Sequence, residues 1–246
     1  MKDNKRRRSL SDNVWRCIVY KIAMATIIEA KGLSKHYQDG DRLVKAVEQV
    51  DLAIAPGDFL SIVGHSGSGK TTLLSLLGGL TRPTSGTAEV DGVDLWSISD
   101  DELARLRNRR VSFIYQFASL IPTLTALENV MLPAVFASPP RDVRDKALEL
   151  LSAVGLGEKI RAYPARLSGG EQRRVAIARS FINDPSVVLA DEPTGDLDQE
   201  TEADVFDFFT EINRKQVAFV LVTHSLQLAA KAATRLQMDH GRLTRI

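Results

Sequence analysis

An eight-residue run from Gly64 to Thr71 has the residue types and spacing of a phosphate-binding loop. Its letters, GHSGSGKT, satisfy every fixed position of the pattern G-x-x-x-x-G-K-[ST]. Glycines let backbone N–H groups turn toward phosphate oxygens, and the positive end of the following helix adds to the attraction. We expect Lys70 to reach the β- and γ-phosphates of ATP and the Thr71 hydroxyl to bind Mg²⁺. The other predicted contacts are Gly64, His65, Ser66, Gly67, Ser68, Gly69 and Thr72, with His65 and Ser66 in lesser roles.

A second apolar segment, residues 187–190, ends in two carboxylates, Asp191 and Glu192. Ligands of α/β sheets bind at the carboxyl ends of the strands, so both side chains are expected at such an edge. Asp191 is a candidate Mg²⁺ ligand, and Glu192 a candidate base that orients and deprotonates an attacking water. After an arbitrary strand, a solvated loop would be the simpler interpretation. The phosphate loop favours catalysis, because it requires a metal partner from a neighbouring strand.

A third candidate is the run LSGGEQRR, which begins at Leu167. Ser168 and Glu171 satisfy a capping box, so an ordinary helix start is one interpretation. Two glycines and a serine at an exposed helix N-terminus also form an anion site. One nucleotide has a single γ-phosphate, so this second site suggests contact with a nucleotide held by another copy.

The elements that must position these residues can be read from the hydrophobic pattern. Residues 27–60 are β-rich, and a strand over 59–63 runs through the phosphate loop into an apolar helix over 73–80. Strand patterns return at 187–190 and 217–222. We therefore predict an α/β P-loop NTPase core with a small antiparallel β lobe at the front.

Residues from about 98 to 166 are predicted to be mostly helical and to form a lobe inserted into the core. A helix over about 141–154 has apolar residues along one side, and Gly155 stops it. Capping boxes mark the starts of two shorter helices, at Ser99 with Glu102 and at Thr125 with Glu128.

Composition excludes several classes of protein. The chain has 246 residues, 44% of them hydrophobic and 26% charged, which is typical of a globular protein. Its net charge of +1 gives no reason to expect nucleic acid as a partner, and the single Cys17 rules out an internal disulfide. No run approaches the roughly 18–20 apolar residues of a membrane span, and basic residues interrupt the only candidate signal peptide. We expect a cytoplasmic protein.

Residues 1–26 are predicted to be a basic, disordered extension, with the folded domain over 27–246. Residues 1–23 contain seven basic and two acidic side chains, and a new start is plausible at Met24. An alternative is a basic amphipathic helix at a membrane surface, because four apolar side chains share one helical face. They are Trp15, Ile18, Val19 and Ile22.

Over residues 27–246 the chain resembles the nucleotide-binding subunits of ABC transporters. Six motifs occur in the order and spacing of that family, which makes the resemblance specific. They are the phosphate loop at 64–71, Gln116 after a strand over 111–115, the signature at 167–172, the acidic strand at 187–192, Asp196-Leu197-Asp198, and Thr223-His224.

The resemblance implies roles for residues that have simpler interpretations when taken alone. Tyr37 corresponds to the aromatic that stacks on adenine, and Gln116 to the glutamine that contacts Mg²⁺ and water and moves with the membrane partner. Asp198 corresponds to the dimer-contact aspartate, and His224 to the histidine on the γ-phosphate. Alone, Tyr37 could be a packing residue, Gln116 a strand end and His224 a satisfied histidine. The signature residues that grip the γ-phosphate across a head-to-tail homodimer correspond to Ser168, Gly169 and Gly170.

The segment from Gln116 to Val130 resembles the lipoprotein-release and macrolide-export branch of the family. Asp196 stands where that branch usually has Asn, and Thr71 or Thr72 where Ser is common; both changes keep the side-chain chemistry. The resemblance implies an ATP-hydrolysing subunit, peripheral on the cytoplasmic face of the inner membrane, that powers a separate integral membrane permease.

Two other functions remain open from the sequence. The ATPase could control a membrane-anchored cell-envelope regulator without transport. A soluble cassette acting on DNA or ribosomes is disfavoured, because the interval from Lys70 to Ser168 is too short for the coiled coil of the DNA-repair relatives. The translation-factor relatives carry two cassettes in one chain, and this chain has one.

Overall fold

The computed structural model of the chain describes residues 26–137, 142–195 and 197–246. Three sequence predictions lie outside the described residues. They concern the disordered or amphipathic character of residues 1–25, the alternative start at Met24, and the presence of Asp196 where the related branch usually has Asn.

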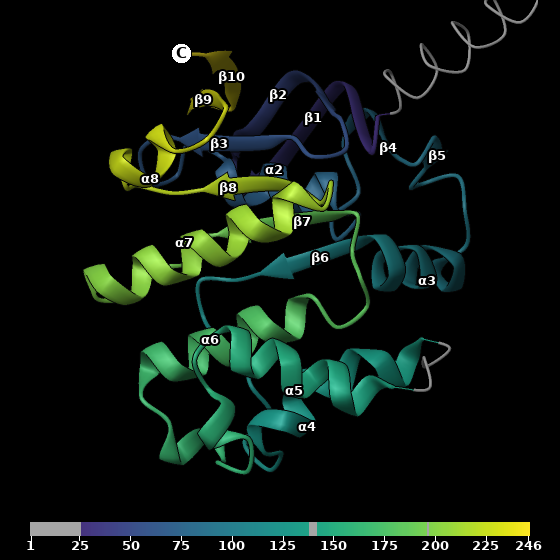
Figure 1. The fold of residues 1–246 in the computed structure, drawn as a ribbon. Helices are drawn as coiled ribbons and strands as arrows, with labels where there is room; N and C mark the ends of the chain where they lie inside the picture. Colours follow the sequence, from purple (N-terminus) through teal and green to yellow (C-terminus); the bar gives the residue numbers. More distant parts are fainter. Residues whose placement is uncertain (1–25, 138–141, 196) are drawn as a thin grey trace, which may run out of the picture.

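The core is a six-stranded sheet in the order β10-β9-β3-β8-β7-β6 (Figure 1). Every strand pair from β9 to β6 is parallel, and only β10 runs antiparallel to its neighbour β9. All residues of β3 and β8 are buried, as expected for apolar strands covered on both faces. The strands are β3 (Phe59–Val63), β6 (Val111–Ile114), β7 (Val187–Asp191), β8 (Ala218–Val222), β9 (Thr234–Asp239) and β10 (Arg242–Arg245).

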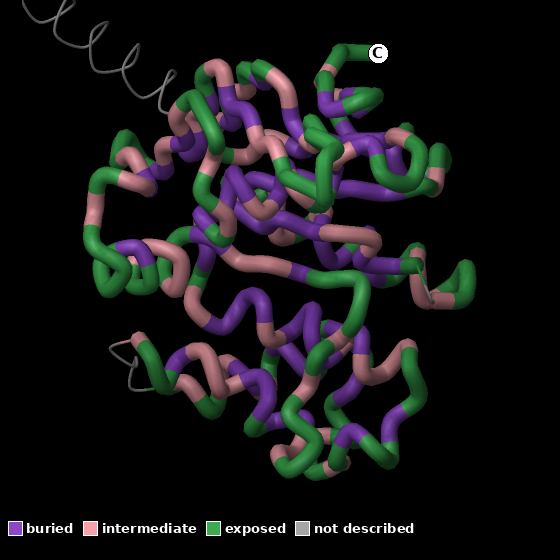
Figure 2. Tube along the Cα trace, turned by 180° about the vertical axis from the view of Figure 1, so that it is seen from behind, coloured by how far each residue is buried: buried purple, intermediate pink, exposed green. Residues whose placement is uncertain are grey.

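Alternating side chains of the central strands enter two separate cores. One core contains Phe59 and Phe219, whose rings stack 5.1 Å apart, and helix α7 (Gln199–Arg214) adds Phe209 at 5.2 Å from Phe219. The other core lies between the opposite face and helix α2 (Lys70–Leu77). Figure 2 shows buried segments through the centre of the molecule and exposed ones around it. Burial on both faces fixes the strand register, because a one-residue slip would exchange the two faces.

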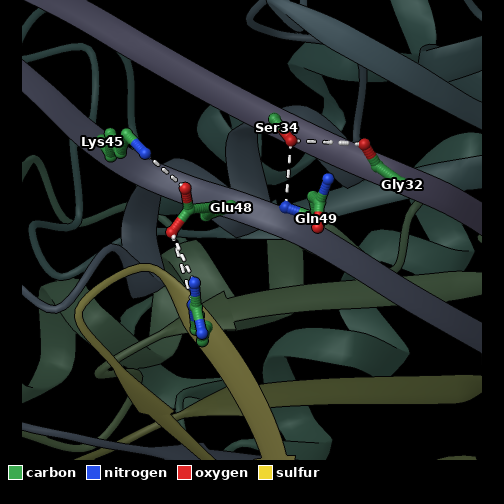
Figure 3. Close-up of polar contacts among 6 residues, drawn as sticks. Gly32, Ser34, Lys45, Glu48 and Gln49 are labelled. Carbon is green, nitrogen blue, oxygen red and sulfur yellow. Dashed lines mark hydrogen bonds and ion pairs between the residues drawn. The ribbon is translucent and has the colours of Figure 1, made fainter.

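A four-stranded antiparallel sheet, in the order β2-β1-β4-β5, covers the core that contains α2. The register of β1 with β2 shifts around Leu33 and Lys35, and Gln49 has a positive φ of 48° at this irregularity. There the Ser34 hydroxyl donates to the Gly32 carbonyl and accepts from the Gln49 N–H at 2.9 Å (Figure 3). The strands are β1 (Ile28–Asp39), β2 (Arg42–Ile54), β4 (Ser85–Val90) and β5 (Val93–Asp94).

Helices between β6 and β7 form a lobe on the other side of the sheet, at the bottom of Figure 1. All three expected capping boxes are present, at the starts of α3, α4 and α6. The elements of the lobe are α4 (Ala126–Met131), η1 (Leu132–Phe136), α5 (Val143–Ala153), η2 (Gly157–Lys159), η3 (Pro164–Arg166) and α6 (Gly169–Ser180). Two further helices lie outside this interval, α3 (Asp100–Arg110) before β6 and α8 (Leu226–Ala230) after β8.

The predicted fold class, an α/β P-loop core with an antiparallel β lobe and an inserted helical lobe, is confirmed. The range 98–166 also contains β6, which pairs with β7 and therefore belongs to the central sheet. Helix α2 begins earlier than its apolar periodicity indicates, at Lys70 and not at Leu73. Its first turn is polar, so the apolar pattern alone cannot locate this start.

Asn129 provides a stability test of the lobe, because it is fully buried and ties α4 to the preceding segment. Its Oδ1 accepts from the Ile121 N–H at 2.8 Å, and its amide donates to three carbonyls, including that of Leu124 at 3.0 Å. We expect Asn129→Ala to lower the free energy of unfolding in urea by about 2–3 kcal/mol, since it leaves a backbone N–H and carbonyls unpaired. The control Glu211→Ala, on the exposed surface of α7, should change it by less than about 0.5 kcal/mol. Equal losses in both variants would contradict this account.

Candidate functional site

The loop between β3 and α2 curls around the Lys70 ammonium. Lys70 Nζ donates to the Gly64 carbonyl at 2.8 Å and to the His65 carbonyl at 2.9 Å. Burial lowers the pKa of Lys70, and the Glu192 and Asp191 carboxylates partly oppose this effect. The loop can close this tightly because Gly69 has a φ of 108° and a Cβ there would lie 1.9 Å from the Ala46 carbonyl oxygen.

Parallel pairing brings the two carboxylates to the same edge as the loop. Asp191 lies opposite Val222 in the pairing of β7 with β8, and β8 in turn pairs with β3. As a result, the Thr71 hydroxyl donates to Asp191 Oδ2 at 2.6 Å. A hydroxyl and a carboxylate in contact are the kind of oxygen ligands that Mg²⁺ prefers, so these two residues fit a magnesium site.

Backbone hydrogen bonds and neighbouring side chains together fix the position of Glu192. Its φ is 47°, an uncommon conformation for a residue other than glycine. Its N–H donates to the Val222 carbonyl at 2.9 Å, and its own carbonyl accepts from the buried Arg173 guanidinium at 3.0 Å. Its side chain is 15% exposed, and its Oε1 lies 3.4 Å from His224 Nε2. Burial raises the pKa of Glu192, although His224 opposes this, so the carboxylate is a stronger base than usual.

These side chains face a cavity of about 680 Å³, here called the site cavity. It brings together residues predicted from widely separated motifs, from Tyr37 near the start of the folded domain to His224 near its end. Of the predicted residues, those that line it are Tyr37, Ser66, Gly67, Gly69, Lys70, Thr71, Thr72, Gln116, Asp191, Glu192 and His224.

Some predicted residues lie elsewhere in the described part of the chain. Ser168, Gly169 and Gly170 are at the start of α6 and do not line the site cavity. The Ser168 hydroxyl accepts from the Glu171 N–H at 3.2 Å, and its own O–H is left to donate. Asp198 caps α7 by accepting from the Thr201 N–H at 2.9 Å.

Three members of the phosphate loop are also absent from the described lining, namely Gly64, His65 and Ser68. His65 faces the turn after β9 instead. Its Nδ1 lies 2.9 Å from the Ser66 carbonyl oxygen, and its Nε2 lies 2.9 Å from Asp239 Oδ1. These two contacts raise the pKa of His65.

The site cavity also has lining residues that the sequence analysis missed. A wall of β2 contributes Arg42, Leu43, Val44, Lys45, Ala46 and Glu48, and the turn after β9 contributes His240 and Gly241. The wall could have been found from the β1–β2 hairpin, because Tyr37 pairs with Val44. No local sequence pattern indicates that the turn after β9 belongs to the site, because the turn reaches the site only through strand pairing.

Comparison with known proteins identifies the family. The sequence profile described as "ABC transporter" matches residues 47–195, which include the phosphate loop, the run at 167–172 and the acid pair. The chain belongs to the ABC transporter family. It is 44% identical over 222 residues to the lipoprotein-releasing system ATP-binding protein LolD of Alcanivorax borkumensis, a match that covers 89% of this chain and 97% of that protein.

Solved structures agree with the sequence relatives. The dimeric structure of a post-hydrolysis state of the ATP-binding cassette MJ0796 bound to ADP and Pi has a TM-score of 0.83 and 36% identity. A second dimeric structure of MJ0796, titled a bacterial ABC transporter cassette, has a TM-score of 0.82 and 37% identity. Each covers 89% of this chain, which in turn covers 98% of each. The predictions of an ATP-binding ABC ATPase, similar to the lipoprotein-release branch, are confirmed.

The raised pKa of Glu192 has a consequence for stability. Above that pKa the folded protein bears the full cost of a buried carboxylate, and below the ordinary value of 4.5 this cost disappears. Glu192→Gln should therefore raise the melting temperature of the nucleotide-free protein at pH 8, and the gain should shrink as the pH falls toward 4.5. Thermal unfolding in EDTA across this range measures it, with Glu211→Gln as the control. A melting temperature below that of the wild type at pH 8 would refute the burial argument.

Proposed function

We propose that this chain is the ATP-hydrolysing subunit of a transporter of the lipoprotein-release type, driving a separate integral membrane permease. The observation that carries the proposal is the site cavity, where Lys70, Asp191, Glu192 and His224 converge. The printed name of its LolD relative, an ATP-binding protein of a lipoprotein-releasing system, favours lipoprotein release over macrolide export.

Nucleotide binding follows from the arrangement of the site cavity. Tyr37 lines the site cavity together with residues of the phosphate loop, and its ring is exposed enough to stack on adenine. The Lys70 ammonium already sits inside the loop, so phosphate oxygens meet a positive charge that needs little rearrangement. Thr71 and Asp191, with Gln116 beside them, would hold Mg²⁺. When bound, Mg²⁺ neutralises part of the charge on the β- and γ-phosphates.

Hydrolysis is assigned to the side chains around Glu192. Its carboxylate, made more basic by burial, orients a water molecule and accepts the water's proton as the oxygen attacks the γ-phosphate. Lys70 and His224 stabilise the charge that spreads over the phosphate oxygens. The 3.4 Å separation of His224 from Glu192 places both side chains where one water and one phosphate could be held together.

Two copies of the chain are proposed to close head-to-tail around ATP. The start of α6, with Ser168, Gly169 and Gly170, offers backbone N–H groups and a hydroxyl donor away from the site cavity of its own chain. Such a helix N-terminus attracts phosphate, and a second copy would supply that phosphate. Asp198, at the start of α7, is the proposed contact between copies. The structures of MJ0796, which are dimeric, support a dimer of this chain.

The proposed place of action is the cytoplasmic face of the inner membrane, reached through the permease. None of the helices in residues 26–137, 142–195 and 197–246 combines the length and apolar character that crossing a bilayer requires. Attachment through a membrane partner is therefore the proposed route. Closure of the dimer would move the helical lobe and the segment around Gln116, and so would pull on that partner.

Glu192→Gln tests the catalytic assignment. The variant should bind ATP with an affinity close to that of the wild type and lose about 10²–10⁴-fold in turnover, because the amide cannot accept the proton of water. Phosphate release and a nucleotide titration measure the two quantities. Glu211→Gln is the matched control and should keep full turnover. Hydrolysis by Glu192→Gln at the wild-type rate would show that another group is the base.

A pull-down tests the membrane partner. Tagged Glu192→Gln protein with Mg-ATP, which favours the closed dimer, would be captured from detergent-solubilised native membranes, and its partners identified by mass. A partner with few spans and a large outer domain is expected. A partner with many spans and little outside the membrane would reject the lipoprotein-release branch, and recovery of soluble partners alone would reject transport.

A further inference from the structure

His65 is brought against the turn after β9 by strand register. In the parallel pairing of β3 with β9, Val63 lies opposite Gln237. Two residues beyond this last pair, His65 of the phosphate loop lies beside Asp239, the last residue of β9. The next two residues, His240 and Gly241, have φ values of 45° and 81° and form the two-residue turn between β9 and β10.

Backbone hydrogen bonds hold the two segments that meet here, the phosphate loop and the β9–β10 turn. The Gly241 N–H donates to the Ser68 carbonyl at 3.0 Å, which ties the turn directly to the phosphate loop. The Gly241 carbonyl accepts from the Glu48 N–H at 2.8 Å. The Glu48 carboxylate also accepts from Lys45, at 2.6 Å (Figure 3). It accepts from Arg242 of β10 as well, at 3.3 Å. The side chains of His65, Asp239 and His240 therefore project from backbone segments that are fixed relative to each other.

The possible ligand atoms of His65, Asp239 and His240 lie close enough together to approach one metal ion. His65 Nε2 lies 2.9 Å from Asp239 Oδ1, and His240 Nε2 lies 3.9 Å from the same oxygen. The three ligand atoms all lie within 4.8 Å of one another. Bonds of about 2.0–2.1 Å in tetrahedral geometry place ligand atoms about 3.4 Å apart, between the two separations observed. Both contacts with Asp239 would reach this spacing after changes of about 0.5 Å.

The contacts of His65 also orient it as a ligand. Its Nδ1 lies 2.9 Å from the Ser66 carbonyl, which can only accept, so Nδ1 carries a hydrogen and Nε2 is directed at Asp239. Imidazoles that bind metals usually donate their other N–H to a carbonyl in this way. A neutral imidazole has only one N–H, so a proton or a metal ion must lie between Nε2 and the Asp239 carboxylate.

We propose that His65, Asp239 and His240 form a binding site for a divalent transition-metal ion, with Zn²⁺ as the representative. Two imidazoles and one carboxylate favour Zn²⁺ and its neighbours over Mg²⁺, which prefers oxygen ligands. The site is therefore chemically distinct from the pair Thr71 and Asp191. Side-chain exposures of 57% for His65, 57% for Asp239 and 87% for His240 leave a fourth position to water. An ion bound here would link the phosphate loop to the β9–β10 turn.

Calorimetric titration of ZnCl₂ into the nucleotide-free, full-length protein tests the site. Every protein carries Cys17→Ser, which removes a competing thiol. One ion per chain is expected, and Asp239→Asn and His240→Asn should each weaken binding by at least about tenfold. Asn is suitable at position 240 because it tolerates the positive φ there. His224→Asn is the matched histidine control and should bind Zn²⁺ like its parent, since His224 lies beside Glu192 and outside the group of His65, Asp239 and His240.

A second readout is the melting temperature. Zn²⁺ should raise it in the parent protein and in His224→Asn, because a ligand that binds only the folded state stabilises that state. Zn²⁺ should raise the melting temperature of His240→Asn much less. The proposal is overturned if the parent binds no Zn²⁺, if all variants bind it alike, or if His224→Asn alone loses binding, since the ion would then lie beside Glu192.

Discussion

Parallel pairing of β8 with both β3 and β7 is the constraint on which the site depends. It carries the ends of three strands to one edge, so that the phosphate loop, the acid pair and His224 meet although they lie far apart in the sequence. No single side chain sets this register. It is fixed by two cores, one on each face, whose apolar side chains alternate along the same strands. The side chains of the site are therefore positioned by the packing of apolar residues that take no part in the reaction.

Residues at this edge are arranged for their chemistry at some expense of stability. Lys70 and Glu192 are both partly removed from water, and burial disfavours the charged form of each. The backbone of Glu192 adds strain, since its φ of 47° costs of order 1–3 kcal/mol. The Val222 carbonyl and the Arg173 guanidinium hold it in place. A fixed, poorly solvated carboxylate needs less rearrangement when water and phosphate arrive.

The sequence predicted what depends on local spacing. The phosphate loop, the three capping boxes and the acidic strand each occupy a short run, so residue types and intervals locate them. Residues that reach the site through strand pairing were missed, such as Lys45 and Glu48 on β2. His65 and Asp239 are 174 positions apart, and their contact depends on the pairing of β3 with β9, which no periodicity reveals. The helix start at Lys70 was missed because the first turn of α2 is polar.

The repeated use of one capping device gives the chain a shared response to acid. Hydrogen bonds from the capping residue lower the pKa of Glu102 and Glu128, and Lys159, followed by the Ser168 N–H, lowers that of Glu171. A lowered pKa means that this stabilisation is present above the ordinary value of 4.5 and is lost as the pH falls through the folded value. Acidification therefore weakens the starts of α3, α4 and α6 through the same kind of contact. One of them, the start of α6, is the surface proposed to contact the ATP of a neighbouring copy.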